Sequence, residues 1–164
     1  MNTLPQLLEE DVLKLDDTLS ELLSQTEATA ALIMDKGGFL IAHQGNSRKF
    51  DLTTIAALAS GAYLANQTIA GLVQETNFNS VYQQGDKFSL FAVCIDEHCL
   101  LLVVFQSQVG IGAVKHFATP AIQTIADQLK VARARNPAAG IDLSVLNLAD
   151  SAGLFHKQPH RAQA

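Results

Sequence analysis

The sequence carries no charged side chain between Asp51 and Glu75, a gap of twenty-three residues in a chain of 164. A helix at the surface of a domain normally combines an apolar stripe with a charged face. A helix without a charged face is expected to be covered on both sides. In so short a chain the second cover is most easily another protein molecule, so the run indicates an interface helix.

A membrane span is the competing explanation, because the run is long enough to cross a bilayer. Seven polar side chains interrupt it: Thr53, Thr54, Ser60, Asn66, Gln67, Thr68 and Gln74. We therefore expect a buried or interface helix and no membrane span.

Charge and cysteine are scarce in the rest of the chain as well. Charged residues make up 16% of the sequence and hydrophobic residues 48%, so much apolar surface must be hidden, some of it between subunits. The net charge of −5 argues against nucleic acid, which calls for a basic patch. Two cysteines and a polar, acidic start without an export signal predict reduced thiols and a cytoplasmic location.

Apolar periodicity and turn residues predict the order α-β-β-α-β-β-β-α. Helices are expected over residues 5–25, over the uncharged run capped by Asp51, and over residues 110–135; strands are expected over residues 29–34, 39–43, 78–83, 88–95 and 99–105. The last two strands are apolar on both faces, as in central strands with helices on either side. The predicted fold class is α+β in three layers. One central helix covers one face of a five-stranded antiparallel sheet, and the two terminal helices cover the other.

Details of these elements are also predicted. Pro5 suits a first helical turn. The exposed face of the first helix is expected to be acidic, with Glu9, Glu10, Asp11, Asp16, Asp17 and Glu21. The last helix is basic overall, so the two should pack side by side. Its expected buried face is Val114, Phe117, Ala121, Ile125, Leu129 and Ala132, and Pro120 should bend it or mark its true start.

Motifs for catalysis or cofactor binding are largely missing. Gly110 and Gly112 follow a strand and open a helix, but Lys115 stands where a dinucleotide loop has its third glycine, and no βαβ unit surrounds them. The five histidines lack the zinc-hydrolase motif, and no Gly-x-Ser-x-Gly elbow is present. We expect no catalytic residue, no cofactor and no metal, and hence no enzyme.

The two cysteines leave several interpretations open. If Asp96 and Glu97 form a two-residue turn, Cys94 faces Cys99 across a hairpin. The pair could then form a disulfide or, with His98, bind a metal. Two small buried thiols are the interpretation that we favour.

Three segments in order resemble one family. Residues 30–42, with an apolar strand, Asp35-x-x-Gly38 and a second apolar strand, resemble the strand–turn–strand signature of the roadblock/dynein light chain superfamily. Residues 58–70 resemble the second helix of its bacterial MglB-type members, and residues 110–115 resemble their entry to the last helix. The resemblance implies a roadblock-like, profilin-like domain over residues 1–136. Residues 137–164 would be a C-terminal extension, partly amphipathic and then disordered.

The resemblance also implies a function. MglB-type proteins form homodimers by pairing their third strands, with the second helices side by side, and bind a small Ras-like GTPase across those helices. They stimulate GTP hydrolysis by reshaping the GTPase's own site, in polarity, motility or signalling. An adaptor dimer without effect on hydrolysis is the main alternative, and a small-molecule sensor or enzyme of profilin-like shape is a third.

Positions carried over from the family give the expected sites. The dimer interface would comprise Leu58, Gly61, Ala65, Phe78, Ser80, Val81 and Tyr82. The GTPase would bind the outward side of the second helix at Ala59, Ala62, Tyr63, Asn66, Gln67 and Ala70, with Tyr63 either as its aromatic anchor or packed against its twin.

Overall fold

The computed structural model describes residues 4–46 and 48–135 of the chain. The elements are α1 (Glu9–Thr26), β1 (Ala30–Asp35), β2 (Leu40–Gly45), α2 (Leu52–Leu72), β3 (Ser80–Gln83), β4 (Phe88–Cys94), β5 (Cys99–Gln106) and α3 (Ile111–Arg135). The strands form one antiparallel sheet in the order β2-β1-β5-β4-β3. The predicted element order and five-stranded sheet are confirmed.

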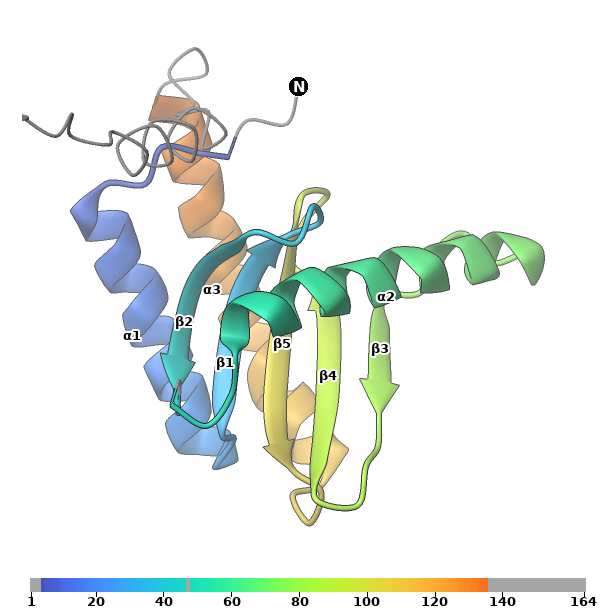
Figure 1. Ribbon diagram of the computed structural model, residues 1–164. Helices are drawn as coiled ribbons and strands as arrows, with labels where there is room; N and C mark the ends of the chain where they lie inside the picture. Colours follow the sequence, from blue (N-terminus) through green and yellow to red (C-terminus); the bar gives the residue numbers. More distant parts are fainter. Residues whose placement is uncertain (1–3, 47, 136–164) are drawn as a thin grey trace, which may run out of the picture.

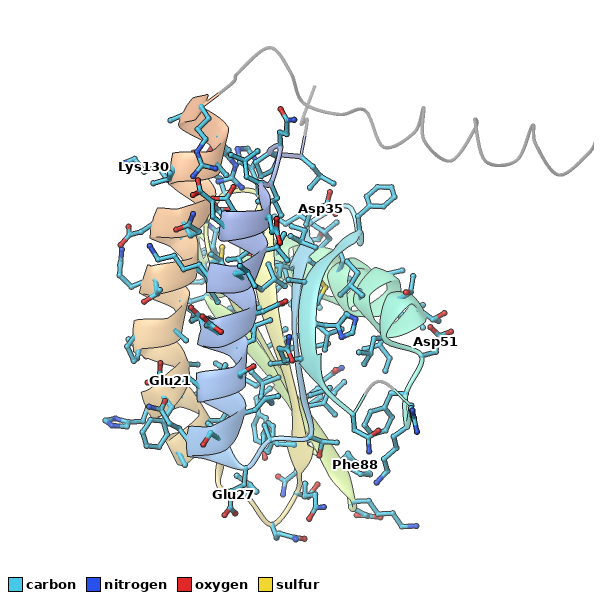
Figure 2. All side chains as sticks on the ribbon, turned by 90° about the vertical axis from the view of Figure 1, so that its left-hand side faces the viewer. Glu21, Glu27, Asp35, Asp51, Phe88 and Lys130 are labelled. Atoms are coloured by element: carbon cyan, nitrogen blue, oxygen red, sulfur yellow. The ribbon has the colours of Figure 1, made fainter. Side chains whose placement is uncertain are left out.

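The molecule has three layers (Figure 1). α2 crosses one face of the sheet, while α1 and α3 lie side by side on the other. Figure 2 shows the same arrangement from the side, with Glu21 of α1 and Lys130 of α3 on one side of the sheet and Asp51, before α2, on the other. The predicted arrangement of layers is confirmed.

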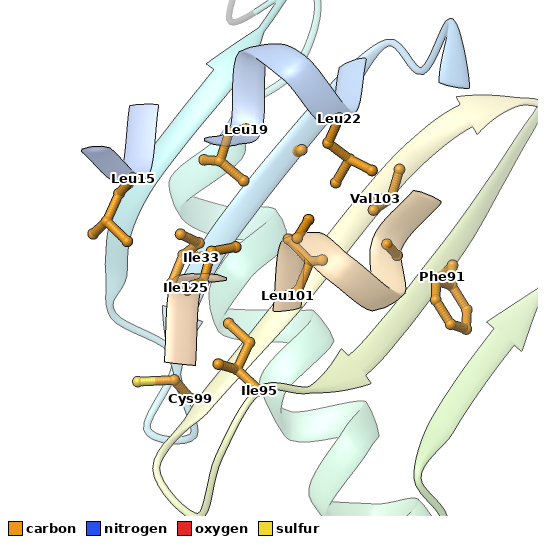
Figure 3. Close-up of a cluster of buried hydrophobic side chains, with 14 of the residues drawn as sticks. Leu15, Leu19, Leu22, Ile33, Phe91, Ile95, Cys99, Leu101, Val103 and Ile125 are labelled. Atoms are coloured by element: carbon orange, nitrogen blue, oxygen red, sulfur yellow. The ribbon is translucent and has the colours of Figure 1, made fainter. Parts of the chain in front are cut away.

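The larger part of the core lies between the sheet and the α1–α3 pair (Figure 3). Its buried side chains include Leu15, Leu19 and Leu22 from α1, Ile33 from β1, Leu101 and Val103 from β5, and Ile125 from α3. Each buried leucine or isoleucine stabilises the fold by about 1.5–3 kcal/mol relative to an exposed one.

The acidic face of α1 is not wholly exposed as expected, because Asp11 is buried. Its carboxylate accepts a hydrogen bond from the Leu8 N–H at 2.8 Å, and from Arg135 and Gln128 of α3. The bond to Leu8 caps the helix, so α1 begins at Glu9 and Pro5 precedes it. The expectation that Pro5 lies in the first turn is wrong.

The buried face of α3 is largely as predicted. Val114, Ala121, Ile125, Leu129 and Ala132 are buried. Phe117 is only half-buried, since the neighbouring Ala118 faces the sheet instead. Pro120 lies well inside a helix that starts at Ile111, so it does not mark the start.

The two thiols do not face each other across the hairpin. Cys94 pairs with Leu100, and the Ile95 N–H donates to the Cys99 carbonyl at 2.9 Å, so Ile95 lies opposite Cys99. The turn between them therefore has three residues, 96–98. One extra residue reverses the faces of a strand. Cys94 therefore packs on the α2 side and Cys99 on the α1–α3 side, and both are free.

Two further expectations concern the membrane and the tail. Among the residues that the structure describes, no helix combines the length and apolarity needed to cross a membrane. The expected extension over residues 137–164 lies outside the described residues, so the domain boundary stays a prediction.

Candidate interaction surface

The start of α2 is fixed by Asp51, as expected. Its carboxylate accepts from the backbone N–H of Thr54 at 3.1 Å and from the Thr54 hydroxyl at 2.6 Å. These bonds from Thr54 hold the pKa of Asp51 below its ordinary value. Such a cap stabilises the first turn of the helix.

One side of α2 packs on the sheet through a narrow set of residues. Leu52, Ala56, Ser60, Tyr63 and Ala70 are buried there. Ala56, Tyr63 and Ala70 are spaced by seven residues, which is about two helical turns and therefore one face. This face joins Ala30, Leu32, Leu100 and Leu102 in the second part of the core.

The opposite side of α2 carries exposed apolar and small residues. Leu72 is 80% exposed and Leu58 70% exposed. The other exposed apolar or small residues of the helix are Ala57, Gly61, Leu64, Ala65, Ile69 and Gly71. Because this face carries no charge, water is a poor cover for it. We call Leu58, Gly61, Ala65, Ile69 and Leu72 the outward face of α2.

Two glycines of α2, Gly61 and Gly71, leave the helix backbone accessible. A Cβ atom placed on Gly61 or on Gly71 would meet nothing within 4 Å. Neither glycine is therefore required by packing within the protomer, although each costs the helix about 1 kcal/mol relative to alanine. An approaching helix or loop can come close to the backbone at these positions.

The expectation that Tyr63 faces outward is wrong, because its side chain is only 3% exposed. The Tyr63 hydroxyl donates to the Phe78 carbonyl at 3.1 Å. Burial raises the pKa of Tyr63 to about 12, and the neighbouring Cys94 adds to the shift. Tyr63 therefore belongs to the core and cannot anchor a partner.

The other expected partner-binding residues point toward the sheet or lie between the buried and the outward side of α2. Gln67 donates to the Phe78 carbonyl at 2.9 Å and accepts from the Phe78 N–H at 3.2 Å. Together with Tyr63 it fixes the segment that leads into β3. Ala70 is fully buried, while Ala59, Ala62 and Asn66 are half-buried.

The expected interface residues on α2 do share one surface. Leu58, Gly61 and Ala65 lie on the outward face, and the structure adds Ile69 and Leu72, which the sequence analysis did not assign. The seven-residue spacing of Ala56, Tyr63 and Ala70 could have identified the buried side. Once that side is set, Leu58 and Leu72 must point away from the sheet.

β3 is an edge strand beside this surface. It pairs only with β4 in the described sheet, and the Cys94 N–H donates to the Asn79 carbonyl at 3.2 Å. Since bonded pairs alternate along an antiparallel ladder, the backbone groups of Ser80 and Tyr82 point to the free edge. The C-terminal end of α2 extends past β3 (Figure 1).

The side chains of β3 pack on both sides of the sheet. Val81 is half-buried under α2, and the Tyr82 ring stacks on Phe105 with ring centres 6.2 Å apart. Phe78 and Ser80 are half-buried. The part of β3 that is free for another chain is thus its backbone edge.

Arg133, Asp96 and Cys99 lie close together, and their polar groups make structural contacts with one another. Arg133 donates to Asp96 at 2.5 Å and to the Cys99 sulfur at 3.4 Å. Burial raises the pKa of the Cys99 thiol to about 12, which makes it unreactive at neutral pH. In residues 4–46 and 48–135, no three histidine, cysteine or carboxylate side chains are grouped to hold a metal ion.

Comparison with protein families gives one match. A model of the Roadblock/LC7 domain matches residues 14–105, which run from α1 to the end of β5. A comparison with curated proteins gives no match.

Solved structures of bacterial proteins share the fold. The gliding protein MglB from Thermus thermophilus is 29% identical, with a TM-score of 0.74 over 80% of this chain and 100% of its own. MglB in a tetrameric arrangement is 28% identical, with a TM-score of 0.75 over 80% of this chain and 99% of its own. Myxococcus xanthus MglB is 25% identical, with a TM-score of 0.71 over 76% of this chain and 94% of its own.

Proposed function

The chain belongs to the Roadblock/LC7 family, and on that basis we propose that it is a homodimeric regulator of a small Ras-like GTPase. It binds the GTPase through paired α2 helices and stimulates GTP hydrolysis. The likeness to MglB, named a gliding protein in Thermus thermophilus, supports a role in motility or cell polarity. The observation that carries the proposal is the uncharged, exposed outward face of α2 beside an unpaired strand edge.

The dimer follows from the position of β3. Two copies can pair their β3 strands antiparallel about a two-fold axis, which joins both sheets into one and satisfies the outward backbone groups of Ser80 and Tyr82. Each α2 helix would then extend across the seam, because its C-terminal end already passes β3 (Figure 1). Ile69 and Leu72 at that end are the residues that the second copy would cover.

The GTPase site lies on the remainder of the outward face. Leu58, Gly61 and Ala65 were expected in the dimer interface, but they are farther from the seam than Ile69 and Leu72. We propose that they replace the expected anchor Tyr63, which is buried. Small residues between leucines favour close approach of another backbone, and apolar side chains fit the desolvated centre of an interface.

The mode of action follows from the chemistry of this face. Residues 52–74 contain no arginine and no other ionisable side chain except the buried Tyr63. The face can therefore offer no arginine finger to the transferred phosphoryl group. We propose that stimulation comes from repositioning residues that the GTPase itself supplies.

The test is phosphate release by candidate small GTPases, with and without the purified chain. We expect faster hydrolysis with the wild-type chain and no stimulation with Gly61→Arg, which places a large charged side chain on the outward face. Leu13→Arg is the matched control, because it places the same side chain at an exposed position of α1, in the other layer. A wild-type chain that binds no candidate GTPase would refute the proposal.

The same assay separates the alternative. An adaptor dimer also needs an apolar face without catalytic side chains, so this surface suits it equally well. Binding of the GTPase with unchanged phosphate release and unchanged nucleotide exchange would identify the chain as an adaptor.

A further inference from the structure

An exposed aromatic side chain lies on the turn between β1 and β2, and this turn contacts α2. Phe39 lies between β1 and β2, and 56% of its surface is exposed. Its turn lies near the N-terminal half of α2 and next to the β4–β5 loop (Figure 1), and it joins the two strands that are farthest from β3 in the sheet.

The turn itself is tightly built. The Asp35 carboxylate accepts from the Phe39 N–H at 2.8 Å, and the Asp35 N–H donates to the Phe39 carbonyl at 3.0 Å. Gly38 has φ +93°, a conformation that glycine adopts without strain. These contacts confirm the hairpin turn predicted over residues 35–38.

The turn is also attached to α2. The Ser60 hydroxyl donates to the Lys36 carbonyl, and the Lys36 ammonium lies 6.0 Å from the centre of the buried Tyr63 ring. A Cβ on Gly38 would come within 2.9 Å of the Ala57 Cα, so the two backbones are in close contact. A further bond, from the Lys36 N–H to the His98 carbonyl at 2.8 Å, ties the turn to the neighbouring loop.

The backbone that carries Phe39 is therefore held in place before any partner binds. A side chain on a mobile loop loses conformational entropy on binding, whereas a preorganised one avoids much of that loss. Aromatic residues, including phenylalanine, are enriched at protein–protein interfaces relative to the rest of the surface.

The size of the α2 surface calls for contacts beyond the helix. A helix of 21 residues is about 31 Å long and exposes a stripe about 10 Å wide, or roughly 300 Å². A stable protein–protein interface buries about 800 Å² on each partner. Two helices of a dimer would provide only about 600 Å², part of it used by the dimer seam.

We infer that Phe39 is an anchor for the protein that binds the outward face of α2, so that the β1–β2 turn extends the GTPase site. The inference rests on the proposed function and adds to the GTPase site a residue outside α2. The partner surface opposite Phe39 is an apolar depression on the GTPase, because a half-exposed phenyl ring gains affinity only when it is desolvated.

The experiment measures binding of a small Ras-like GTPase, loaded with a non-hydrolysable GTP analogue, to the full chain. Phe39→Ser should weaken binding about tenfold or more, whereas Phe39→Leu should weaken it by less than about threefold. Leu13→Ser is the matched control, because Leu13 is 57% exposed but lies on α1 in the other layer. We expect it to bind like the wild type.

The outcomes separate the two proposals. Absence of binding by the wild type would refute the proposed function and this inference together. Loss of binding by Gly61→Arg with normal binding by Phe39→Ser would refute the inference alone. Amide hydrogen exchange of wild-type residues 36–40 gives a second measurement that needs no variant, and unchanged exchange in the complex would also refute it.

Discussion

The two helical layers of this molecule differ in how they are closed. The α1–α3 layer buries most of its large apolar side chains against the sheet, and two of its ion pairs connect the two helices. The α2 layer buries one side and leaves the other apolar and exposed. The first arrangement stabilises the protomer, and the second leaves apolar surface free for other molecules.

Charge is distributed in the same way. Arg135 of α3 contacts Asp11 and Glu10 of α1, and Arg133 contacts Asp96 in the β4–β5 loop. These contacts connect elements far apart in the sequence on the α1–α3 side. Residues 52–74 have no charge, so α2 has neither a charged face nor an ion pair of its own.

The largest expected effect is the difference in stability between a leucine truncated in the α1–α3 layer and one truncated on α2. Leu129→Ala on α3 removes a fully buried side chain and should lower the free energy of unfolding by about 2–5 kcal/mol. Leu72→Ala on α2 removes an exposed one and should change the stability of the protomer by less than about 0.5 kcal/mol. Urea unfolding at low protein concentration measures both. Equal effects would remove the distinction between the layers.

The second effect concerns the buried carboxylate. Asp11→Ala should cost about 1–3 kcal/mol at neutral pH, because it removes the acceptor of the Leu8 N–H and of Gln128 and leaves Arg135 with Glu10 alone. Burial raises the pKa of Asp11, but the bonds from Arg135, Leu8 and Gln128 outweigh it and hold the pKa below the ordinary 3.8.

The sign of the pH dependence follows from this shift. A carboxyl whose pKa is lower in the folded state stabilises the fold above its unfolded pKa, and this contribution is lost as pH falls through the folded pKa. The difference between wild type and Asp11→Ala should therefore shrink as the pH is lowered from about 7 to about 3. A difference that stays constant across urea titrations over this range would contradict the assignment.

The element order could be predicted from the sequence because alternation, turn glycines and helical periodicity are local signals. The partners of Asp11 could not, since Gln128 and Arg135 lie more than a hundred residues away. An acidic residue on the helix was therefore expected to be exposed. The faces of Cys94 and Cys99 depended on the length of one loop, which was one residue longer than expected.

The orientation of α2 was the main error, and it has a physical cause. A charged face normally shows which side of a helix meets water, and this helix has none. Size was the remaining guide, but Ala56 and Ser60 face the sheet while Leu58 and Leu72 face outward. Tyr63 packs in the core, and its hydroxyl is satisfied there by the Phe78 carbonyl, a partner that the sequence does not reveal.

The third prediction tests the dimer seam. Leu72→Asp places a carboxylate on the end of α2 that passes β3, and burying it without a partner should raise the dimer dissociation constant about tenfold or more. Leu13→Asp, on the exposed side of α1, is the matched control and should leave the dimer intact. Sedimentation over a range of concentrations measures both. A Leu72→Asp chain as dimeric as the wild type would place the seam elsewhere.

The smallest effect distinguishes a free helix surface from a closely packed one. Gly61→Ala should stabilise the isolated protomer by about 0.5–1 kcal/mol, because alanine favours the helix and its Cβ meets nothing within 4 Å. If another backbone approaches Gly61 closely in the dimer, the same methyl group should weaken association instead. Urea unfolding and sedimentation of this one variant therefore report on the two states separately. A gain in stability with unchanged dimerisation would support the placement of Gly61 in the GTPase site. Weaker dimerisation would place Gly61 in the dimer seam instead.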